Sequence, residues 1–400
     1  MKRLTIKNIG PVKNIEIDLN RINIFIGPQS SGKSTVAKII SFCQWLEKDC
    51  IANQSVKHID AKFVNDKFII YHDISSYLRL ESFFHYQSEI LDITYNTGIM
   101  IVNGMQKFDS AGLSKNAYIP SERNVISIPG VMNVKMPDNY ILDFIDDWQV
   151  IRDKYKNGES LNLLDLEVKY SYDKEAKEDR IVLNNGDSIP YSQASSGLQS
   201  LAPLCVYVDY ITRWIYAHKE YESALQRQKL RDAMDRIIRL DDIDEWIKTH
   251  QKPYQYRIAE LENRLSTIKA TNVVIEEPEQ NLFPKTQVNL LYYILSSLDH
   301  NRDHLVVTTH SPYILYALNN CILAYWVKKQ GEFDIREFSS IPEEAILNPD
   351  MVSVWEISDG EILGNKRIQD NNGLIRKNFF DNVMGEVIND FSNLLGIADL

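Results

Sequence analysis

Apolar and polar positions alternate through the first 26 residues, which is the pattern of strands that bury one face. Strands are predicted over residues 4–6, 15–19 and 22–26, with a turn at Gly10-Pro11 after the first. From residue 33 to about residue 48 the apolar positions recur at helical spacing instead. The chain is therefore predicted to pass from a strand through a short glycine-containing loop into a helix.

The middle of the chain predicts strands joined by polar turns, and residues 60–110 are expected to form strands and short connections. A hairpin is predicted at residues 93–101, and a strand is expected to end at residues 118–120. A helix is predicted at residues 140–155, followed by strands at residues 166–172 and 180–183. From residue 197 to residue 269 nearly every position is compatible with a helix. The charged interval 219–269 resembles a protruding helical hairpin.

The last third of the chain alternates short apolar strands with helices. Strands are predicted at residues 272–275, 304–308 and 321–327, and helices between them at residues 285–298 and 312–318. This alternation implies an α/β core with parallel strands. A final amphipathic helix is expected over residues 374–395.

The composition is that of an ordinary soluble globular protein, with 400 residues of which 44% are hydrophobic and 25% charged. The charged start lacks the apolar core of a signal peptide, and no run approaches the roughly 18 apolar residues of a membrane span, so a cytoplasmic protein without membrane contact is expected. The formal charge of −11 argues against non-specific coating of nucleic acid, although a local basic groove stays open. Inert thiols are expected at the four cysteines, Cys43, Cys50, Cys205 and Cys321, which form no C-x-x-C pair.

The loop between the third strand and the first helix has the pattern G-x-x-x-x-G-K-[ST]. Its glycines let successive backbone N–H groups face phosphate oxygens, the helix presents its positive end, and the lysine reaches the β and γ phosphates. Lys33 is therefore the expected phosphate ligand, and Ser34 is the expected ligand of Mg²⁺. We predict that ATP is bound and hydrolysed here, with its phosphates surrounded by Gly27, Pro28, Gln29, Ser30, Ser31, Gly32, Lys33, Ser34 and Thr35.

A second candidate is the apolar strand that ends in Glu276 and Glu277. Neighbouring residues at a strand end point in different directions, so Glu276 can face a Mg²⁺ ion while Glu277 orients the attacking water. Acidic residues at the start of a helix would look the same in isolation. The glycine loop upstream favours the catalytic interpretation.

Two more segments become candidates in this context. His310 follows the next predicted strand, where it can contact the γ-phosphate and sense hydrolysis; a structural histidine is the alternative. Residues 194–200 directly precede a helix, whose N-terminus is suited to holding a terminal phosphate; a plain helix cap is the alternative. The residues selected in this segment are Ser195, Ser196, Gly197 and Gln199.

Four segments resemble the motifs of the ABC-type ATPase head and occur in the same order. The glycine loop resembles Walker A, and residues 195–199 resemble the signature. The acidic strand end resembles Walker B, and Thr309-His310-Ser311 resembles the switch-histidine element. The opening residues are similar to those of the RecF, SMC and OLD branch, and residues 276–284 resemble the OLD-like form most closely. The resemblance implies an α/β P-loop NTPase of the ABC ATPase type with an N-terminal antiparallel β subdomain. It divides the chain into ATPase core residues 1–212, a helical insertion at residues 213–269, and core residues 270–400.

The same resemblance implies a role for single residues and for a second copy of the chain. Glu277 would be the catalytic carboxylate and His310 the switch. Lys33 and Ser34 would serve the phosphates and Mg²⁺. Two heads of this family sandwich ATP, so a homodimer or higher oligomer is implied, in which the residues acting in trans are Ser196, Gly197 and Gln199.

The chain departs from the family pattern at several positions. Glu276 stands where many ABC proteins have aspartate, and Leu198 replaces a second glycine of the signature. No Q-loop glutamine can be assigned: Gln87 is one candidate, and Arg123 is another residue that could lie beside the nucleotide. The helical insertion follows the signature, whereas SMC proteins insert long coiled coils before it.

Most OLD nucleases carry a C-terminal Toprim domain, but the region after residue 327 is short for such a domain and contains no Asp-x-Asp. We expect an ATPase whose head dimerisation regulates an effector such as a nuclease, in anti-phage defence or DNA metabolism. The alternative is a repair ATPase that senses DNA ends or junctions by binding nucleic acid directly. The energy subunit of a membrane transporter is disfavoured by the N-terminal strands. No nuclease centre is expected from the scattered residues Asp359, Glu361, Asp370 and Asp381.

Overall fold

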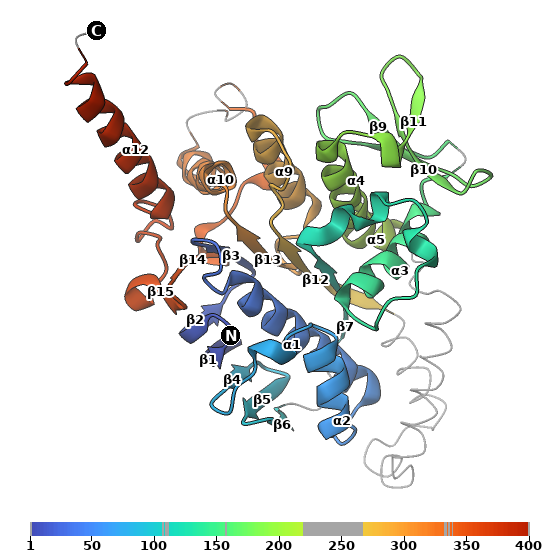
Figure 1. Cartoon of the computed structure of the whole chain (residues 1–400), viewed down its shortest axis with the longest axis vertical. Helices are drawn as coiled ribbons and strands as arrows, with labels where there is room; N and C mark the ends of the chain where they lie inside the picture. The colour runs from blue at the N-terminus through green and yellow to red at the C-terminus, as the bar shows by residue number, and fades with distance from the viewer. Residues whose placement is uncertain are drawn as a thin grey trace.

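A computed structural model of the protein describes residues 2–105, 108, 112–156, 158–218, 267–331, 334, 337 and 339–398. Almost all of the expected helical insertion lies outside the described residues. Figure 1 shows the arrangement of the described helices and strands.

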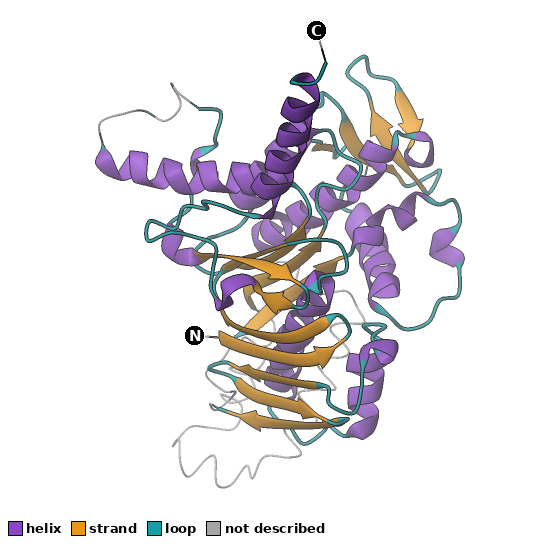
Figure 2. Cartoon of the chain, turned by 60° about the vertical axis from the view of Figure 1, so that its left-hand side comes forward, coloured by secondary structure: helices purple, strands orange, loops and turns teal. Residues whose placement is uncertain are grey.

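One sheet of eleven strands forms the centre of the structure (Figures 1 and 2). Its order is β6-β5-β4-β1-β2-β15-β14-β3-β13-β12-β7. The five strands from β14 to β7 are parallel, whereas those from β6 to β2 are antiparallel. The strands are β1 (Lys2–Ile9), β2 (Val12–Leu19), β3 (Ile22–Ile26), β4 (Phe83–Gln87), β5 (Leu91–Asn96), β6 (Ile99–Gly104), β7 (Leu113–Ile119), β12 (Ile268–Glu276), β13 (His304–Thr309), β14 (Val352–Ser358) and β15 (Glu361–Ile362).

Helices cover both faces of the parallel half of this sheet. On one face lies α1 (Lys33–Asn53); on the other lie α4 (Ser196–Asp209), α9 (Pro284–Ser297) and α10 (Pro312–Gln330). A small sheet of order β11-β10-β9-β8 extends the second layer. The other elements used below are α2 (Ala61–Val64), α3 (Tyr140–Arg152), α5 (Ile215–His218), α12 (Phe379–Leu395), β8 (Leu161–Asn162), β9 (Lys169–Asp173), β10 (Glu178–Val182) and β11 (Ser188–Pro190).

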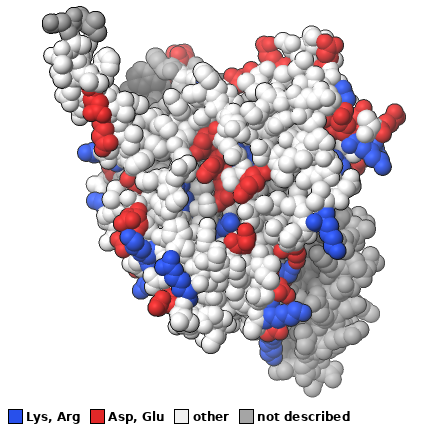
Figure 3. All heavy atoms as spheres, viewed as in Figure 1, with Lys and Arg blue, Asp and Glu red and all other residues white. Residues whose placement is uncertain are grey.

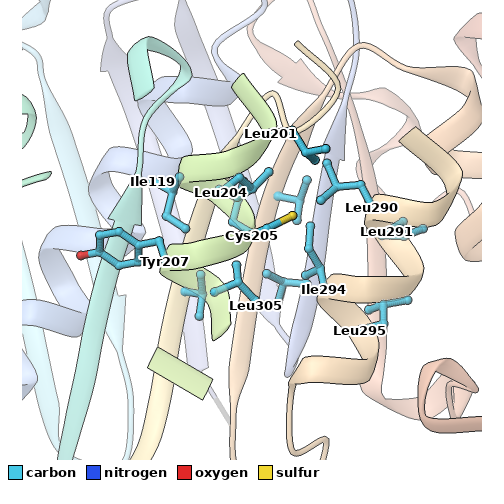
Figure 4. Packing of buried hydrophobic residues seen from close by; sticks show 14 of the residues in the cluster. Ile119, Leu201, Leu204, Cys205, Tyr207, Leu290, Leu291, Ile294, Leu295 and Leu305 are labelled. Carbon is cyan, nitrogen blue, oxygen red and sulfur yellow. The ribbon is translucent and has the colours of Figure 1, made fainter. Parts of the chain in front are cut away.

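The parallel strands are buried on both faces because alternate side chains point to opposite sides. In β3, Ile24 and Ile26 belong to the core that contains α4, α9 and α10, while Phe25 belongs to the core that contains α1. Figure 4 shows the first of these cores, where apolar side chains of α4 and α9 meet above the strands. This packing holds β3, β13 and β12 side by side, so that the loops after their C-terminal ends lie at one edge of the sheet.

The α/β fold and its N-terminal antiparallel region are as predicted, and most of the expected elements are present. These include the first three strands, the helix after the glycine loop, the hairpin of β5 and β6, and strands β7, β9, β10, β12 and β13. The helices expected over residues 140–155, 285–298 and 374–395 correspond to α3, α9 and α12.

Three predictions of secondary structure were wrong or missing. Residues 321–327 continue helix α10 instead of forming a strand, because an apolar run of this length has no period that separates the two. Residues 61–70, where strands and short connections were expected, form α2 followed by a π-helical turn. Helix α2 begins after Asp60, whose side chain caps it by accepting a hydrogen bond from the Phe63 amide. Strand β14 was not predicted, because six of its seven residues are buried and its sequence does not alternate.

Two expectations from composition concern membranes and thiols. Within the described ranges, no helix is long and apolar enough to cross a membrane. All four cysteines are free and buried, and burial raises the pKa of their thiols. Thiols kept protonated in this way are poor nucleophiles.

Candidate functional site

The glycine loop connects β3 to α1 in a conformation that two of its glycines require. Gly27 has a φ of 144° and Gly32 a φ of 109°. A Cβ atom on Gly27 would lie 2.0 Å from the carbonyl oxygen of Ile357, and one on Gly32 would lie 2.7 Å from Val12 Cγ2. Strands β14 and β2 therefore approach the loop so closely that its path is fixed by packing.

Lys33 begins α1 and folds back over the loop. Its Nζ donates to the carbonyl oxygen of Pro28 at 2.7 Å and to that of Gly27 at 3.0 Å. Burial lowers the pKa of Lys33 to about 8, although the nearby carboxylates of Glu277 and Glu279 oppose the shift. The buried ammonium group is thus held against the glycine loop by neutral carbonyl acceptors.

Glu276 ends β12 and is buried beside Ser34, which is exposed. Burial raises the pKa of the Glu276 carboxyl, and the hydroxyls of Tyr118 and Ser34 oppose that shift. Its Oε1 atom is buried and accepts no hydrogen bond from the described residues. A buried carboxylate oxygen without a donor, next to a serine hydroxyl, fits Mg²⁺, which is bound through oxygen ligands.

Glu277 and His310 lie together after the ends of the adjacent strands β12 and β13. His310 Nε2 is 3.3 Å from Glu277 Oε1, and the two side chains are 28% and 35% exposed. The hydrogen bond from His310 lowers the pKa of the Glu277 carboxyl, and the charge of Lys33 acts in the same direction. Glu276 and Glu277 therefore differ sharply although they are neighbours in sequence: one is buried, and the other is ionised and open to solvent.

Glu279 takes part in this site although the sequence analysis did not select it. Its Oε1 accepts a hydrogen bond from the His310 amide at 2.5 Å, and burial raises the pKa of its carboxyl. The contact ties the loop after β12 to the loop after β13. The only signal in the sequence is its position in the same acidic run as Glu277.

Arg123 packs against the loop after β12, residues 277–283, which we call the acidic loop. This position corrects the expectation that Arg123 could lie beside the nucleotide. The residue is fully buried, and its guanidinium donates to main-chain carbonyl oxygens. Burial lowers its pKa to about 10. Arg123 therefore fixes the backbone around the acidic strand end. Its acceptors are the carbonyl oxygens of Glu276 (2.9 Å), Glu277 (2.8 Å), Pro278 (3.2 Å), Pro120 (3.2 Å) and Ser200 (3.1 Å).

The start of α4 is exposed on one side and joined to the acidic loop on the other. Ser195 caps the helix, and both Ser195 and Ser196 are exposed. Asn281 Nδ2 donates to the Ser200 hydroxyl at 2.9 Å. A Cβ on Gly197 would lie only 3.1 Å from the Asn281 carbonyl oxygen. The structure thus places this segment against its own acidic loop with its cap facing outward.

Two glutamines considered from the sequence are engaged elsewhere. Gln199 Nε2 donates to the carbonyl oxygen of Ser192 at 2.9 Å. Gln87 lies on β4, which four strands separate from β3, and its Nε2 donates to Asp92 at 3.4 Å. The interpretation of Gln87 as a candidate for the Q-loop residue was therefore wrong.

The acidic residues of the C-terminal region have separate contacts. Asp359 pairs with Lys13 at 2.9 Å, and Asp370 pairs with Arg376 at 2.7 Å. Asp381 belongs to the capping box of α12. Asp370 and Asp381 thus stabilise their own turn and helix start, whereas Asp359 forms an exposed pair with a residue of β2.

A family model described as an AAA domain matches residues 3–283. The search of curated proteins gives no match.

Matching solved structures include two Smc heads and an ATP-binding cassette of an ABC transporter. An Smc head bound to the C-winged helix domain of ScpA matches with a TM-score of 0.38 and 12% identity, over 79% of this chain and 91% of that one. An Smc head with an extended coiled coil bound to the ScpA C-terminal domain, from Pyrococcus furiosus, matches with a TM-score of 0.38 and 10% identity, over 91% and 96%. An ATP-binding cassette of an ABC transporter in its ADP conformation matches with a TM-score of 0.30 and 11% identity, over 91% and 90%.

Proposed function

The chain belongs to the AAA-domain family and is an ATPase, and on this premise we propose that the glycine loop, Glu276, Glu277 and His310 form its hydrolysis site. The observation that carries the proposal is the contact between Glu277 and His310, 3.3 Å apart and accessible to solvent. Lys33 lies close enough to influence the pKa of Glu277. A carboxylate whose pKa is lowered stays ionised at neutral pH and can accept a hydrogen bond from the attacking water.

Lys33 and the start of α1 would bind the phosphates. The ammonium group now donates to carbonyl oxygens, and the charged oxygens of ATP are stronger acceptors than these. Phosphate charge next to Lys33 would also raise its pKa back toward the ordinary value. Mg²⁺, held by Ser34 and Glu276, would neutralise charge on the β and γ phosphates.

The acidic loop would position the attacking water. Glu277 would accept a hydrogen bond from the attacking water, and His310 would contact the γ-phosphate. Arg123 acts as a positioning residue, since it holds the carbonyl oxygens of Glu276 and Glu277 without facing the reacting atoms. The two carboxylates are thereby kept at fixed positions relative to the glycine loop.

Replacement of Lys33 tests this site. Purified protein is expected to hydrolyse ATP with Mg²⁺, and Lys33→Ala should lower turnover by about a hundredfold or more. Lys328→Ala is the matched control, because Lys328 is exposed and pairs with Glu343 on the surface. Equal turnover by Lys33→Ala and the wild type would contradict the assignment.

We propose further that two copies close over ATP, with the start of each α4 completing the site of the other. This rests on the motif order and on the exposed cap at Ser195 and Ser196, because a helix N-terminus attracts phosphate. Sedimentation velocity should show an ATP-dependent dimer. Ser196→Arg should abolish it, whereas Ser392→Arg, at an exposed serine of α12, should not. A chain that stays monomeric with ATP under all conditions speaks against closure.

The proposed biological role is regulation of a partner effector such as a nuclease by this closure, in anti-phage defence or DNA metabolism, in the cytoplasm. The placement in the OLD-like branch that supports it comes from the motifs. Co-expression with the product of the neighbouring co-transcribed gene tests the role. The effector's activity should change with ATP, and an effector that ignores ATP would contradict it.

Direct binding of DNA ends or junctions is the second candidate from the sequence. On the face shown in Figure 3, acidic side chains gather near the middle of the described residues, and Lys and Arg lie mainly toward the edges. Phosphate contacts on this face would meet like charge. Binding to duplex ends that weakens steeply with salt would support this candidate against the first.

A further inference from the structure

Helix α12 extends away from the body of the molecule (Figures 1 and 2). Its attachments lie at its first turn. The Phe379 amide donates to Glu356 Oε2 at 3.2 Å, and the Tyr316 hydroxyl donates to Asp381 Oδ1 at 2.6 Å. Asn378 and Asp381 form a capping box that starts the helix. The orientation of the helix is thus set by contacts at its N-terminal end. From Asn382 onward its residues are exposed, apart from the half-buried Gly385.

One face of α12 is apolar and uncovered. Met384 and Val387 are each 59% exposed, and Phe391 and Leu394 are 65% and 67% exposed. Their alternating spacing of three and four residues is the seam spacing of helices that pack against another helix. We call this face the apolar stripe: Val383, Met384, Val387, Ile388, Phe391, Leu394 and Leu395.

The sequence of α12 does not favour a helix that stands alone. A single helix of this length is marginal in water even when it is rich in alanine. This one contains Gly385 in its middle and the β-branched residues Val383, Val387 and Ile388, which lower helix propensity. Burial of the apolar stripe against a second surface would supply the missing stability.

The charges on α12 indicate what that second surface is. From residue 379 to residue 395 the sequence contains Asp381, Glu386 and Asp390 and no lysine or arginine. By helical spacing, Asp390 lies next to Val387 and Leu394 at one edge of the apolar stripe, and Asp381 lies next to Met384 at the other. A second copy of α12 would bring like charges together at these edges, and an anionic membrane surface would repel them.

We propose that α12 is a docking site for a partner protein, and that it takes an amphipathic helix whose apolar face is bordered by lysine or arginine. The proposal rests on the proposed function in so far as that function includes a partner protein. It adds where the partner binds and which chemistry recognises it. Apolar contact supplies the affinity, and the carboxylates select the sign of the partner's charge.

A designed peptide tests this docking site on the full chain. The probe is a fluorescent peptide of leucine and lysine, as long as α12, with its leucines on one helical face. Fluorescence anisotropy should show binding to the wild type, and the double variant V387D/F391D should weaken it by at least about tenfold. Leu80→Asp is the matched control, because Leu80 is 83% exposed outside α12.

A charge exchange tests the partner's chemistry. In the variant E386K/D390K, the leucine–lysine peptide should bind more weakly, and the corresponding leucine–glutamate peptide should bind more tightly than it does to the wild type. A peptide of the same composition with scattered leucines should not bind either protein. Equal binding of the leucine–lysine peptide to the wild type and to V387D/F391D would overturn the proposal.

Two other occupants would be recognised by their own measurements. Self-association in sedimentation velocity that V387D/F391D abolishes would assign the stripe to a second copy. Co-sedimentation with phosphatidylcholine–phosphatidylglycerol vesicles that the same variant abolishes would assign it to a membrane. Either result overturns the proposal.

Hydrolysis measured on the same wild-type preparation separates this proposal from the proposed function. Protein that hydrolyses ATP but does not bind the peptide contradicts docking alone. Protein that binds the peptide but does not hydrolyse ATP contradicts the assigned site alone. Thermal unfolding of each variant shows whether its fold is retained.

Discussion

The glycine loop and the acidic loop meet at the same edge of the sheet but are built in different ways. The glycine loop is shaped by its own backbone, since a Cβ on Gly27 would lie 2.0 Å from a carbonyl oxygen of β14. The acidic loop is held by hydrogen bonds to other segments: Arg123 donates to its carbonyl oxygens, and its own Glu279 accepts from the His310 amide. A site can therefore combine one part fixed by local conformation with another fixed by long-range hydrogen bonds.

The two loops also hold their charges differently. Lys33 is held by neutral carbonyl oxygens, and its pKa falls to about 8 because it is buried. Glu277 faces a histidine, and its pKa is lowered by that hydrogen bond. The cation is thus ready to exchange its partners for phosphate, while the carboxylate keeps the partner with which it is proposed to act.

Replacing a glycine breaks the first loop and should give the largest effect. Gly27→Ala forces a shift of the loop or of β14, so ATP affinity should fall by about a hundredfold or more. Gly98→Ala is the matched control, because Gly98 also has a positive φ, at 83°, but no heavy atom within 4 Å of its Cβ position. It should cost about 1 kcal/mol of stability and leave ATP affinity unchanged. Isothermal titration with both proteins measures the difference, and equal affinities would show that the loop is not shaped as described.

Replacing Arg123 breaks the second loop and should affect turnover more than binding. Arg123→Met leaves carbonyl oxygens without donors, so the free energy of unfolding should fall by about 3 kcal/mol. Turnover should fall by about tenfold or more, while the KM for ATP changes less, because the glycine loop is intact. Steady-state kinetics and thermal unfolding measure both effects.

The controls for Arg123 separate position from stability. Arg123→Lys keeps the charge with fewer donors and should lie between the wild type and Arg123→Met. Arg3→Met removes an exposed arginine that pairs with Asp18 and should change stability by no more than about 0.5 kcal/mol. If Arg123→Met and the wild type have the same turnover, Arg123 does not position the acidic loop.

The pH dependence of ATP affinity should show how the glycine loop holds Lys33, and the expected effect is smaller than those above. The pKa of Lys33 is lowered to about 8 in the free protein, whereas bound phosphates favour its charged form. As the pH rises through 8, binding must take up a proton, so ATP affinity should fall by up to about tenfold per pH unit. Lys33→Arg stays charged and should lack this dependence. Titrations at a series of pH values decide the point, and a flat profile for the wild type would contradict it.

The contrast between the loops also explains what the sequence could predict. The strand, glycine loop and helix were predicted because their pattern is contiguous and local. Glu277 and His310 could be expected near one another because each follows a parallel strand. Arg123 could not, since two of its acceptors, Ser200 and Pro278, are 77 and 155 residues away and no local pattern marks them.

Elements whose apolar residues show no clear period were the other gap. Strand β14 has no alternating pattern because both of its faces are covered. The end of α10 was mistaken for a strand because the length of the helix, rather than its period, identifies it. The helical character of α12 could be predicted from its amphipathic sequence, but its exposure depends on where the rest of the chain lies.

The central claim is that Glu277, beside His310, activates water while the glycine loop binds ATP. Glu277→Gln keeps the size of the side chain and removes its charge. With Mg²⁺, turnover should fall by about a hundredfold or more while ATP affinity is retained. Glu361→Gln, at an exposed glutamate of β15, is the control and should have wild-type turnover. Unchanged turnover in Glu277→Gln would contradict the account.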